Sequence, residues 1–177
     1  MPQIELVKIT PAMIRMAETN AAQIAGAKDY AYNSYDNNIG TMLGEEIAKC
    51  YLGLPARSSK AYDLVLPDGR TIDVKTKQLG VSGYPRDSWT VGISSLGNTS
   101  SKPADIYVFT TVRRDKTEGW MQGWVTSEDF MDRSVLKKKG ERDGFITFQH
   151  DGRILLQGDL KPIIDLKKVV DTPFTQA

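Results

Sequence analysis

The chain is poor in the residues that mark several classes of protein. Its 177 residues include one cysteine, Cys50, which cannot form an internal disulfide and so indicates a reducing compartment. No run of about 18 apolar residues is present, which excludes a membrane-spanning helix. The N-terminus lacks a basic segment followed by an apolar one, so we expect no secretion signal, no membrane partner and a cytoplasmic location.

The chain also lacks a strong net charge. It carries 23 Lys and Arg residues against 22 Asp and Glu residues, which gives a formal net charge of +1. Proteins that hold nucleic acid by bulk charge are usually far more basic, so any nucleic-acid surface here should be a local patch. A hydrophobic content of 40% and a length of 177 residues are ordinary for one globular domain with a buried core.

Two helices are predicted in the first third of the chain. A Thr-Pro pair is a favourable helix start and is followed by helix-forming residues, which predicts a helix over residues 11–25. Residues 27–38 are polar and aromatic and predict a loop. The second helix is predicted over residues 39–52, where apolar side chains recur at helical spacing and Gly53 follows the last of them.

The rest of the chain is rich in strand patterns. Residues 105–112 (DIYVFTTV) have the strongest β-composition and predict a buried central strand. A charged turn leads to a strand at residues 120–125, after which Thr126 or Ser127 can cap a short helix. The tail predicts a hairpin around residues 151–152 and a further strand. This order predicts a single α/β domain over residues 1–177, with a mixed β-sheet flanked by helices.

The most informative segment is YDLVLPDGRTIDVKTK, residues 62–77. Two apolar-rich arms flank a Pro-Asp-Gly turn signal, so the segment predicts a β-hairpin. Because side chains alternate along a strand, Asp73 and Lys75 are expected on one face, with the residues between and beside them on the other.

The first arm of this hairpin alternates as well. Its apolar residues are expected to share one face, opposite Asp63; they are Tyr62, Leu64 and Leu66. If the arms pair in register, Asp63 and Asp73 converge with Lys75 on a small patch. Two carboxylates at such a short distance repel each other, and a bound divalent cation usually neutralises this repulsion. A lysine beside such a cation can hold and polarise a water molecule, which suits attack on a phosphodiester.

A bare Asp-x-Lys triplet is weak evidence, and the chain contains a second copy at residues 165–167. The nearest upstream acid there is Asp159, and Pro162 interrupts the arm between them, so no hairpin can pair an acid with Asp165. We therefore interpret the second copy as a solvated strand end or turn. The first copy differs because an acid lies one arm earlier, with a turn between and apolar residues on both arms.

A helix that carries a glutamate precedes the hairpin, in GTMLGEEIAKCYLG at residues 40–53. Together with the hairpin and the strand at residues 105–112, it resembles the PD-(D/E)XK nuclease superfamily over roughly residues 39–130. The family pattern is a helix with a glutamate, an acid at the start of one strand, and acid-x-lysine on the next. The resemblance implies a restriction-endonuclease-like core whose catalytic residues are Glu45, Asp63, Asp73 and Lys75.

The same resemblance implies a Mg²⁺-dependent endonuclease that acts on DNA, with Mn²⁺ as a substitute metal. Asp63, Asp73 and the backbone carbonyl of Val74 would bind the metal. Glu45 would bind a second ion or orient the first through water, and Lys75 would position the attacking water. We expect a homodimer, because duplex DNA has two strands related by a pseudo-dyad.

The chain departs from the family pattern in three ways. Tyr62 stands where proline is typical, and Asp73 replaces the more frequent glutamate, which keeps a carboxylate but shortens its reach. Glu45 and Glu46 are adjacent and point about 100° apart on a helix. Glu45 is preferred because the family's glutamate usually follows a glycine, as Glu45 follows Gly44; Glu46 is the alternative.

Several polar residues near the hairpin have two interpretations. Lys77 and Gln78 could contact the scissile strand or its phosphates, or be ordinary exposed residues at a strand end. Three others lie in bordering loops and could meet phosphates, although solvated surface charge accounts for each of them singly: Arg57, Lys60 and Arg86. The lysine run at residues 137–139 is likewise a candidate nucleic-acid patch or a solvated helix end.

Other functions stay open at this point. The acids and lysine of the hairpin could form a structural salt-bridge cluster. The domain could be a non-catalytic nucleic-acid-binding or assembly module on the same fold, or an RNA-directed nuclease. The fold alone does not decide between DNA cleavage, RNA cleavage and binding without cleavage.

Overall fold

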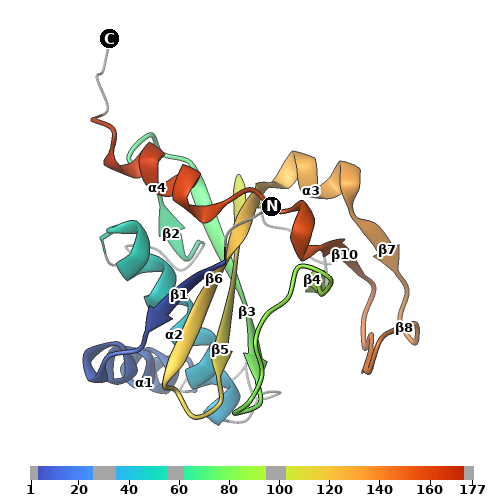
Figure 1. Ribbon diagram of the computed structural model, residues 1–177, viewed down its shortest axis with the longest axis horizontal. Helices are drawn as coiled ribbons and strands as arrows, with labels where there is room; N and C mark the ends of the chain where they lie inside the picture. The colour runs from blue at the N-terminus through green and yellow to red at the C-terminus, as the bar shows by residue number, and fades with distance from the viewer. Residues whose placement is uncertain (1–3, 26–34, 56–61, 95–102, 174–177) are drawn as a thin grey trace.

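The computed structural model describes residues 4–25, 35–55, 62–94 and 103–173. The described chain is mixed α/β and is built around a curled five-stranded sheet (Figure 1). From one edge to the other, its strands are β1 (Glu5–Lys8), β6 (Glu118–Thr126), β5 (Ile106–Arg113), β3 (Thr71–Leu79) and β2 (Leu64–Val65). Strands β3 and β5 run parallel and the other neighbours are antiparallel, so the sheet is mixed, as predicted.

Strand β5 is the buried central strand that its composition predicts. Every residue from its first, Ile106, through Val112 is buried. Side chains of β5 therefore enter two separate apolar clusters, one on each face of the sheet. β-branched and aromatic residues suit this position because they pack well on a pleated surface that is covered on both sides.

Helices cover one face of the sheet. α2 (Tyr35–Leu52) and α4 (Ile163–Asp171) pack against the strands, and α1 (Pro11–Ala25) packs on α2. The N-terminus of α1 is capped as expected, because Thr10 Oγ1 accepts a hydrogen bond from the Met13 N–H at 3.3 Å. No helix in the described ranges is long and apolar enough to cross a membrane.

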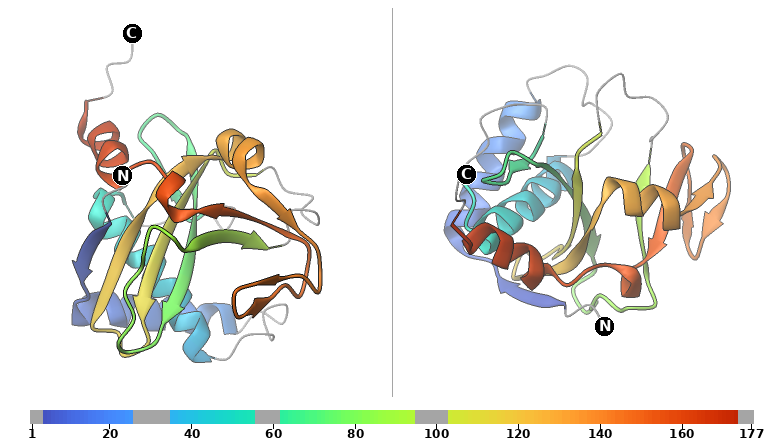
Figure 2. Two further views of the ribbon diagram at one scale, coloured as in Figure 1. Left: turned by 45° about the vertical axis from the view of Figure 1, so that its right-hand side comes forward. Right: turned by 90° about the horizontal axis from the view of Figure 1, so that it is seen from above.

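A second, smaller sheet covers the opposite face. It has three antiparallel strands in the order β4 (Thr90–Ser94), β10 (Gly152–Leu156) and β7 (Val135–Lys137). Figure 2 shows it on the side of the main sheet away from α1 and α2. The two sheets share an apolar cluster that includes Val91, Leu155, Phe109 and Phe130. Phe130 belongs to α3 (Ser127–Arg133), the short helix that the sequence predicts, and Thr126 is its N-cap.

Of the loop predicted over residues 27–38, residues 27–34 lie outside the described ranges, and the prediction is wrong for residues 35–38, because α2 begins at Tyr35. Asp and Asn are favoured around helix N-termini, so a polar stretch is compatible with a helix start as well as with a loop. Strand β1 was not predicted at all. It has only four residues, and their burial alternates without an apolar run.

The tail differs most from the prediction. Its hairpin pairs β8 (Arg142–Asp143) with β9 (Ile146–Thr147), around Gly144 rather than around residues 151–152. Gly144 has a φ of 58°, which a hairpin turn needs and which glycine adopts at no steric cost. The predicted last strand is instead α4. Ile163 and Leu166 are its buried residues, three positions apart, which is a helical spacing.

Candidate functional site

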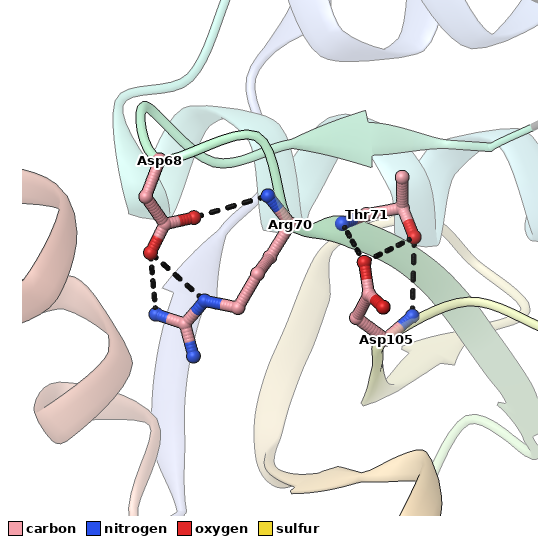
Figure 3. Close-up of polar contacts among 4 residues, drawn as sticks. All are labelled: Asp68, Arg70, Thr71 and Asp105. Carbon is pink, nitrogen blue, oxygen red and sulfur yellow. Dashed lines mark hydrogen bonds and ion pairs between the residues drawn. The ribbon is translucent and has the colours of Figure 1, made fainter.

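The hairpin that carries the Asp-x-Lys motif forms as predicted. β2 and β3 are antiparallel, with Leu64 opposite Ile72. The turn between them is closed by the Asp68 carboxylate, which accepts a hydrogen bond from the Arg70 N–H at 3.0 Å and pairs with the Arg70 guanidinium (Figure 3). Gly69 has a φ of 89°, so a residue with a side chain would be strained at this point.

A second contact fixes β3 beside β5. The Asp105 carboxylate accepts hydrogen bonds from the backbone N–H and the hydroxyl of Thr71, at 2.8 and 3.0 Å (Figure 3). The Thr71 hydroxyl oxygen in turn accepts from the Asp105 N–H at 3.1 Å. These bonds hold the parallel register, in which Asp73 lies beside Tyr107.

The two faces of β3 differ as alternation predicts. Ile72 and Val74 are buried in the cluster under α2, whereas Asp73 and Lys75 are half-buried on the opposite face. The Lys75 ammonium lies 2.8 Å from the Asp73 carboxylate. Both charges therefore lie on the face that the second sheet covers, among apolar residues of the second cluster.

Asp63 joins this pair from the other arm of the hairpin. Its carboxylate accepts a hydrogen bond from the Val74 N–H at 2.7 Å, which satisfies a backbone donor just beyond the end of the β2–β3 ladder. Burial, then the charge of Asp73 and a hydrogen bond with its carboxyl group, raise the pKa of Asp63, which is about 6 in the folded protein. The Val74 N–H and the Lys75 ammonium act in the opposite direction. Asp63, Asp73 and Lys75 are thus brought together as predicted.

Two tyrosines neighbour the aspartates, Tyr107 beside Asp73 in the sheet and Tyr62 next to Asp63 in the chain, and the sequence predicts neither as a site residue. Tyr107 lies beside Asp73 in the parallel register, and burial together with the Asp73 charge raises the pKa of its phenol. Tyr62 was expected on the face of Leu64, which is wrong, because it packs against the second cluster instead. It precedes the first residue of β2, so strict alternation does not reach it.

The helix glutamates lie on α2, whose close approach to the sheet is set by glycine. A Cβ at Gly44 would collide with the Thr76 side chain, so only glycine fits at this contact. Glu46 is 5% exposed, and its carboxylate pairs with Lys49 at 2.7 Å on the same helix. Glu45 is half-buried on the same helix. The preference for Glu45 as the helix carboxylate stays a prediction, with Glu46 as its alternative.

The residues predicted around the hairpin divide between the two faces of β3. Lys77 lies on the face of Lys75, with its ammonium 5.0 Å from the centre of the Trp89 ring. Gln78 lies on the other face, where a Cβ at Gly40 of α2 would collide with its side chain, so it is not an exposed strand-end residue. Arg86 is exposed in the loop before β4, and residues 57 and 60 fall outside the described ranges.

The donor set at the site suits a hard divalent cation. Two carboxylates in contact, with a raised pKa on one of them, are oxygen ligands of the type that Mg²⁺ and Mn²⁺ prefer. Within the described ranges, Glu45 does not join Asp63 and Asp73 as a third carboxylate of one group. Both roles expected for Glu45, binding a second ion and orienting the first through water, stay predictions.

No protein-family model matches the chain, and a search of curated proteins finds no significant match. The functional argument therefore depends on the residues and their geometry.

The raised pKa of Asp63 predicts how metal-free stability depends on pH. The folded state holds the Asp63 proton up to a pKa of about 6, above the ordinary value of 3.8 in the unfolded chain. Between these values the folded state binds more protons, so this group's contribution to stability falls as pH rises and stays low above pH 6. Asp63→Asn removes the buried charge and should raise the free energy of unfolding at pH 8 by about 1–3 kcal/mol in EDTA.

Urea unfolding at pH 4 and pH 8 measures this effect. The gain from Asp63→Asn should be small at pH 4, where wild-type Asp63 is largely protonated in the folded protein. Asp68 is the control, because its pKa is shifted in the opposite direction: the hydrogen bond with Arg70 lowers it. Asp68→Asn should therefore give no gain at pH 8. A less stable Asp63→Asn protein at pH 8 would contradict the assigned environment of Asp63.

Proposed function

We propose that this chain is a metal-dependent nuclease of the PD-(D/E)XK type that hydrolyses phosphodiester bonds in DNA as an endonuclease. The observation that carries the proposal is the contact between Asp63 and Asp73 in a buried setting: burial first, and then the charge of Asp73 and a hydrogen bond with it, raise the pKa of Asp63 to about 6. A divalent cation relieves repulsion between carboxylates as a bound proton does. Lys75, 2.8 Å from Asp73, supplies the positive group that the chemistry requires.

We further propose that the core is restriction-endonuclease-like. The order of elements supports this: a helix with Glu45, the β2–β3 hairpin with the acids and lysine, then β5 parallel to β3 and β6 antiparallel to β5. In this proposal the core spans about residues 39–130, and β1, α1 and the tail are additions to it. A homodimer on duplex DNA belongs to the same proposal.

The proposed mechanism assigns one task to each residue. Asp63 and Asp73, with the Val74 carbonyl, would hold Mg²⁺ or Mn²⁺. When bound, the metal supplies Lewis-acid polarisation of the phosphoryl oxygen. Lys75 orients the attacking water and donates hydrogen bonds to the charge that develops on the phosphoryl group. Glu45 orients water from the helix side.

Tyr107 is a further candidate for this work, because its phenol lies in the field of Asp73 and on the same face. A donor to a charged phosphate contributes about 1.5–3 kcal/mol, so Tyr107→Phe should slow cleavage by about tenfold or more. The ring remains, and with it the edge-to-face contact with Phe130 at 5.6 Å, so the melting temperature should change little. Unchanged cleavage by a folded Tyr107→Phe protein would exclude this role.

The substrate is tested with labelled duplex, single-stranded and branched DNA and with RNA, each in Mn²⁺ and in EDTA. The proposal expects DNA cleavage in Mn²⁺ that EDTA abolishes. Retention of DNA without cleavage would instead support a non-catalytic binding module. Cleavage of RNA alone would support an RNA-directed nuclease, and neither binding nor cleavage would support a structural ion-pair cluster.

A further inference from the structure

A hairpin at the margin of the molecule carries a fully exposed aromatic side chain. Beyond the β8–β9 pairs, the hairpin is extended by bonds between Gly140 and the Phe148 carbonyl and between Phe148 and the Glu141 carbonyl, at 2.8 and 2.9 Å. Phe145 lies in its two-residue turn and is 101% exposed. Figure 2 shows the hairpin at the side of the molecule away from α1 and α2.

An aromatic residue at this position adds nothing visible to the fold. Residues typical of hairpin turns are glycine, asparagine and aspartate, which favour the required backbone conformation. Gly144 meets that requirement here with a φ of 58°. None of the apolar surface of Phe145 is buried by the fold, and the neighbouring Ile146 is 53% exposed. The tip is therefore suited to contact with another molecule.

The base of the hairpin is fixed by its acidic residues. Asp151 pairs with the Lys138 ammonium at 2.9 Å and accepts a hydrogen bond from the Lys139 N–H at 2.9 Å. The Asp143 carboxylate accepts from the Thr90 hydroxyl on β4, and Glu141 accepts from the Lys138 N–H. These bonds hold the tip in one position relative to the second sheet.

The basic residues of the hairpin are left available by the same arrangement. The side chains of Lys139 and Arg142 are exposed and form no ion pair within the described part of the chain. An apolar tip flanked by available positive charges is complementary to nucleic acid, which offers phosphates outside and stacked bases inside. The hairpin also extends from the sheet that covers the face of Asp73 and Lys75.

We propose that this hairpin is a DNA-binding wedge, in which Phe145 inserts against the bases of a duplex while Lys139 and Arg142 contact the flanking phosphates. The proposal rests on the proposed nuclease function and adds a substrate property to it. A wedge favours DNA that unstacks easily, such as mismatched or branched duplex, because unstacking then costs less.

The test measures binding of a fluorescein-labelled duplex by anisotropy in the Asp73→Asn background, which keeps the DNA intact. Phe145→Ser should weaken binding about tenfold, and Phe145→Tyr, which retains a ring, should not. Arg142→Gln should weaken binding and reduce the salt dependence by about one ion. Val81 is the matched control: it is 64% exposed on a loop elsewhere, and Val81→Ser should leave binding unchanged.

A second readout reports the wedge itself. A duplex with 2-aminopurine beside a mismatch should brighten when bound by protein with Phe145 and should brighten less with Phe145→Ser. Equal affinity and equal brightening for both would overturn the wedge, and the nuclease proposal would stand on its own cleavage test. If Phe145→Ser instead changes only the oligomeric state or binding to anionic vesicles, the partner is a second copy or a membrane, and the proposal is wrong.

Discussion

Asp73→Asn is expected to lower DNA cleavage in Mn²⁺ by at least about 10³-fold while the protein stays folded. The substitution keeps the shape of the side chain but removes one of the two adjacent carboxylates and the charge that Lys75 pairs with. Asp73 is half-buried and asparagine has nearly the same shape, so the substitution opens no cavity in the apolar core. Initial rates on a labelled duplex, with circular dichroism on the same samples, measure both effects.

Lys75→Met should reduce cleavage by about 10²–10³-fold, because the donor to the developing phosphoryl charge is lost and the carboxylates remain. The chain supplies its own controls in the second Asp-x-Lys. That copy lies on α4, where Asp165 pairs with Lys168 at 3.3 Å on the exposed side of the helix. Asp165→Asn and Lys167→Met should leave the rate unchanged. Equal losses of cleavage rate at both Asp-x-Lys copies would show that removing any such charge lowers activity. The assignment of Lys75 to the active site would then be wrong.

Gly44→Ala is expected to destabilise the protein by about 1–3 kcal/mol, although alanine normally stabilises a helix interior relative to glycine. The reason is the contact between α2 and the sheet. A Cβ at Gly44 would lie 2.6 Å from the Thr110 hydroxyl oxygen and even closer to the Thr76 side chain. Those two hydroxyls are 3.0 Å apart in a hydrogen bond, so neither can move away freely. Urea unfolding measures the loss.

Two glycines serve as controls for this prediction. At Gly80 a Cβ would meet nothing within 4 Å, so Gly80→Ala should be nearly neutral. At Gly40, on the same helix, the obstacle is the end of the flexible Gln78 side chain, so Gly40→Ala should cost less than Gly44→Ala. Thr76→Ala combined with Gly44→Ala should recover part of the loss. A stabilised Gly44→Ala protein would mean that α2 is farther from β3 than described.

Where local signals agree with packing, the sequence predicts the structure well. The turn at Pro67, Asp68 and Gly69 has the residues that a tight turn requires, and apolar residues alternate on β3 with Asp73 and Lys75. The register of the hairpin follows from these features. The convergence of Asp63 and Asp73 could therefore be predicted from the segment alone.

The tail could not be predicted in the same way. Ile163, Leu166 and Val170 face the core at helical spacing, but the surrounding β-branched residues also suit a strand, and only packing against β6 and α2 decides between them. The true hairpin turn is marked by Gly144, and the Asp-Gly pair at residues 151–152 is an equally strong turn signal. In the folded chain Asp151 instead binds Lys138 and Lys139 at the base of the β8–β9 hairpin.

Tyr107 shows a different limit. The residues around Tyr107 in the sequence predict only a buried strand. Nothing in them predicts that Tyr107 lies beside Asp73. The contact depends on the parallel register of β3 and β5, which the bonds between Thr71 and Asp105 fix across 34 positions of the chain. Pairing between distant strands is a property of the whole fold, so side chains that reach a site in this way are missed by sequence patterns.

The central claim is that Asp63 and Asp73 form a metal-dependent phosphodiesterase centre, and cleavage by the Asp63→Asn protein tests it most directly. This variant is expected to be more stable than wild type at pH 8 in EDTA, because it lacks the buried charge. Loss of activity therefore could not be attributed to unfolding. With labelled duplex and excess Mn²⁺ at pH 8, we predict cleavage by wild type and at least about a 10³-fold lower rate for Asp63→Asn. Cleavage by both proteins at the same rate would contradict the account.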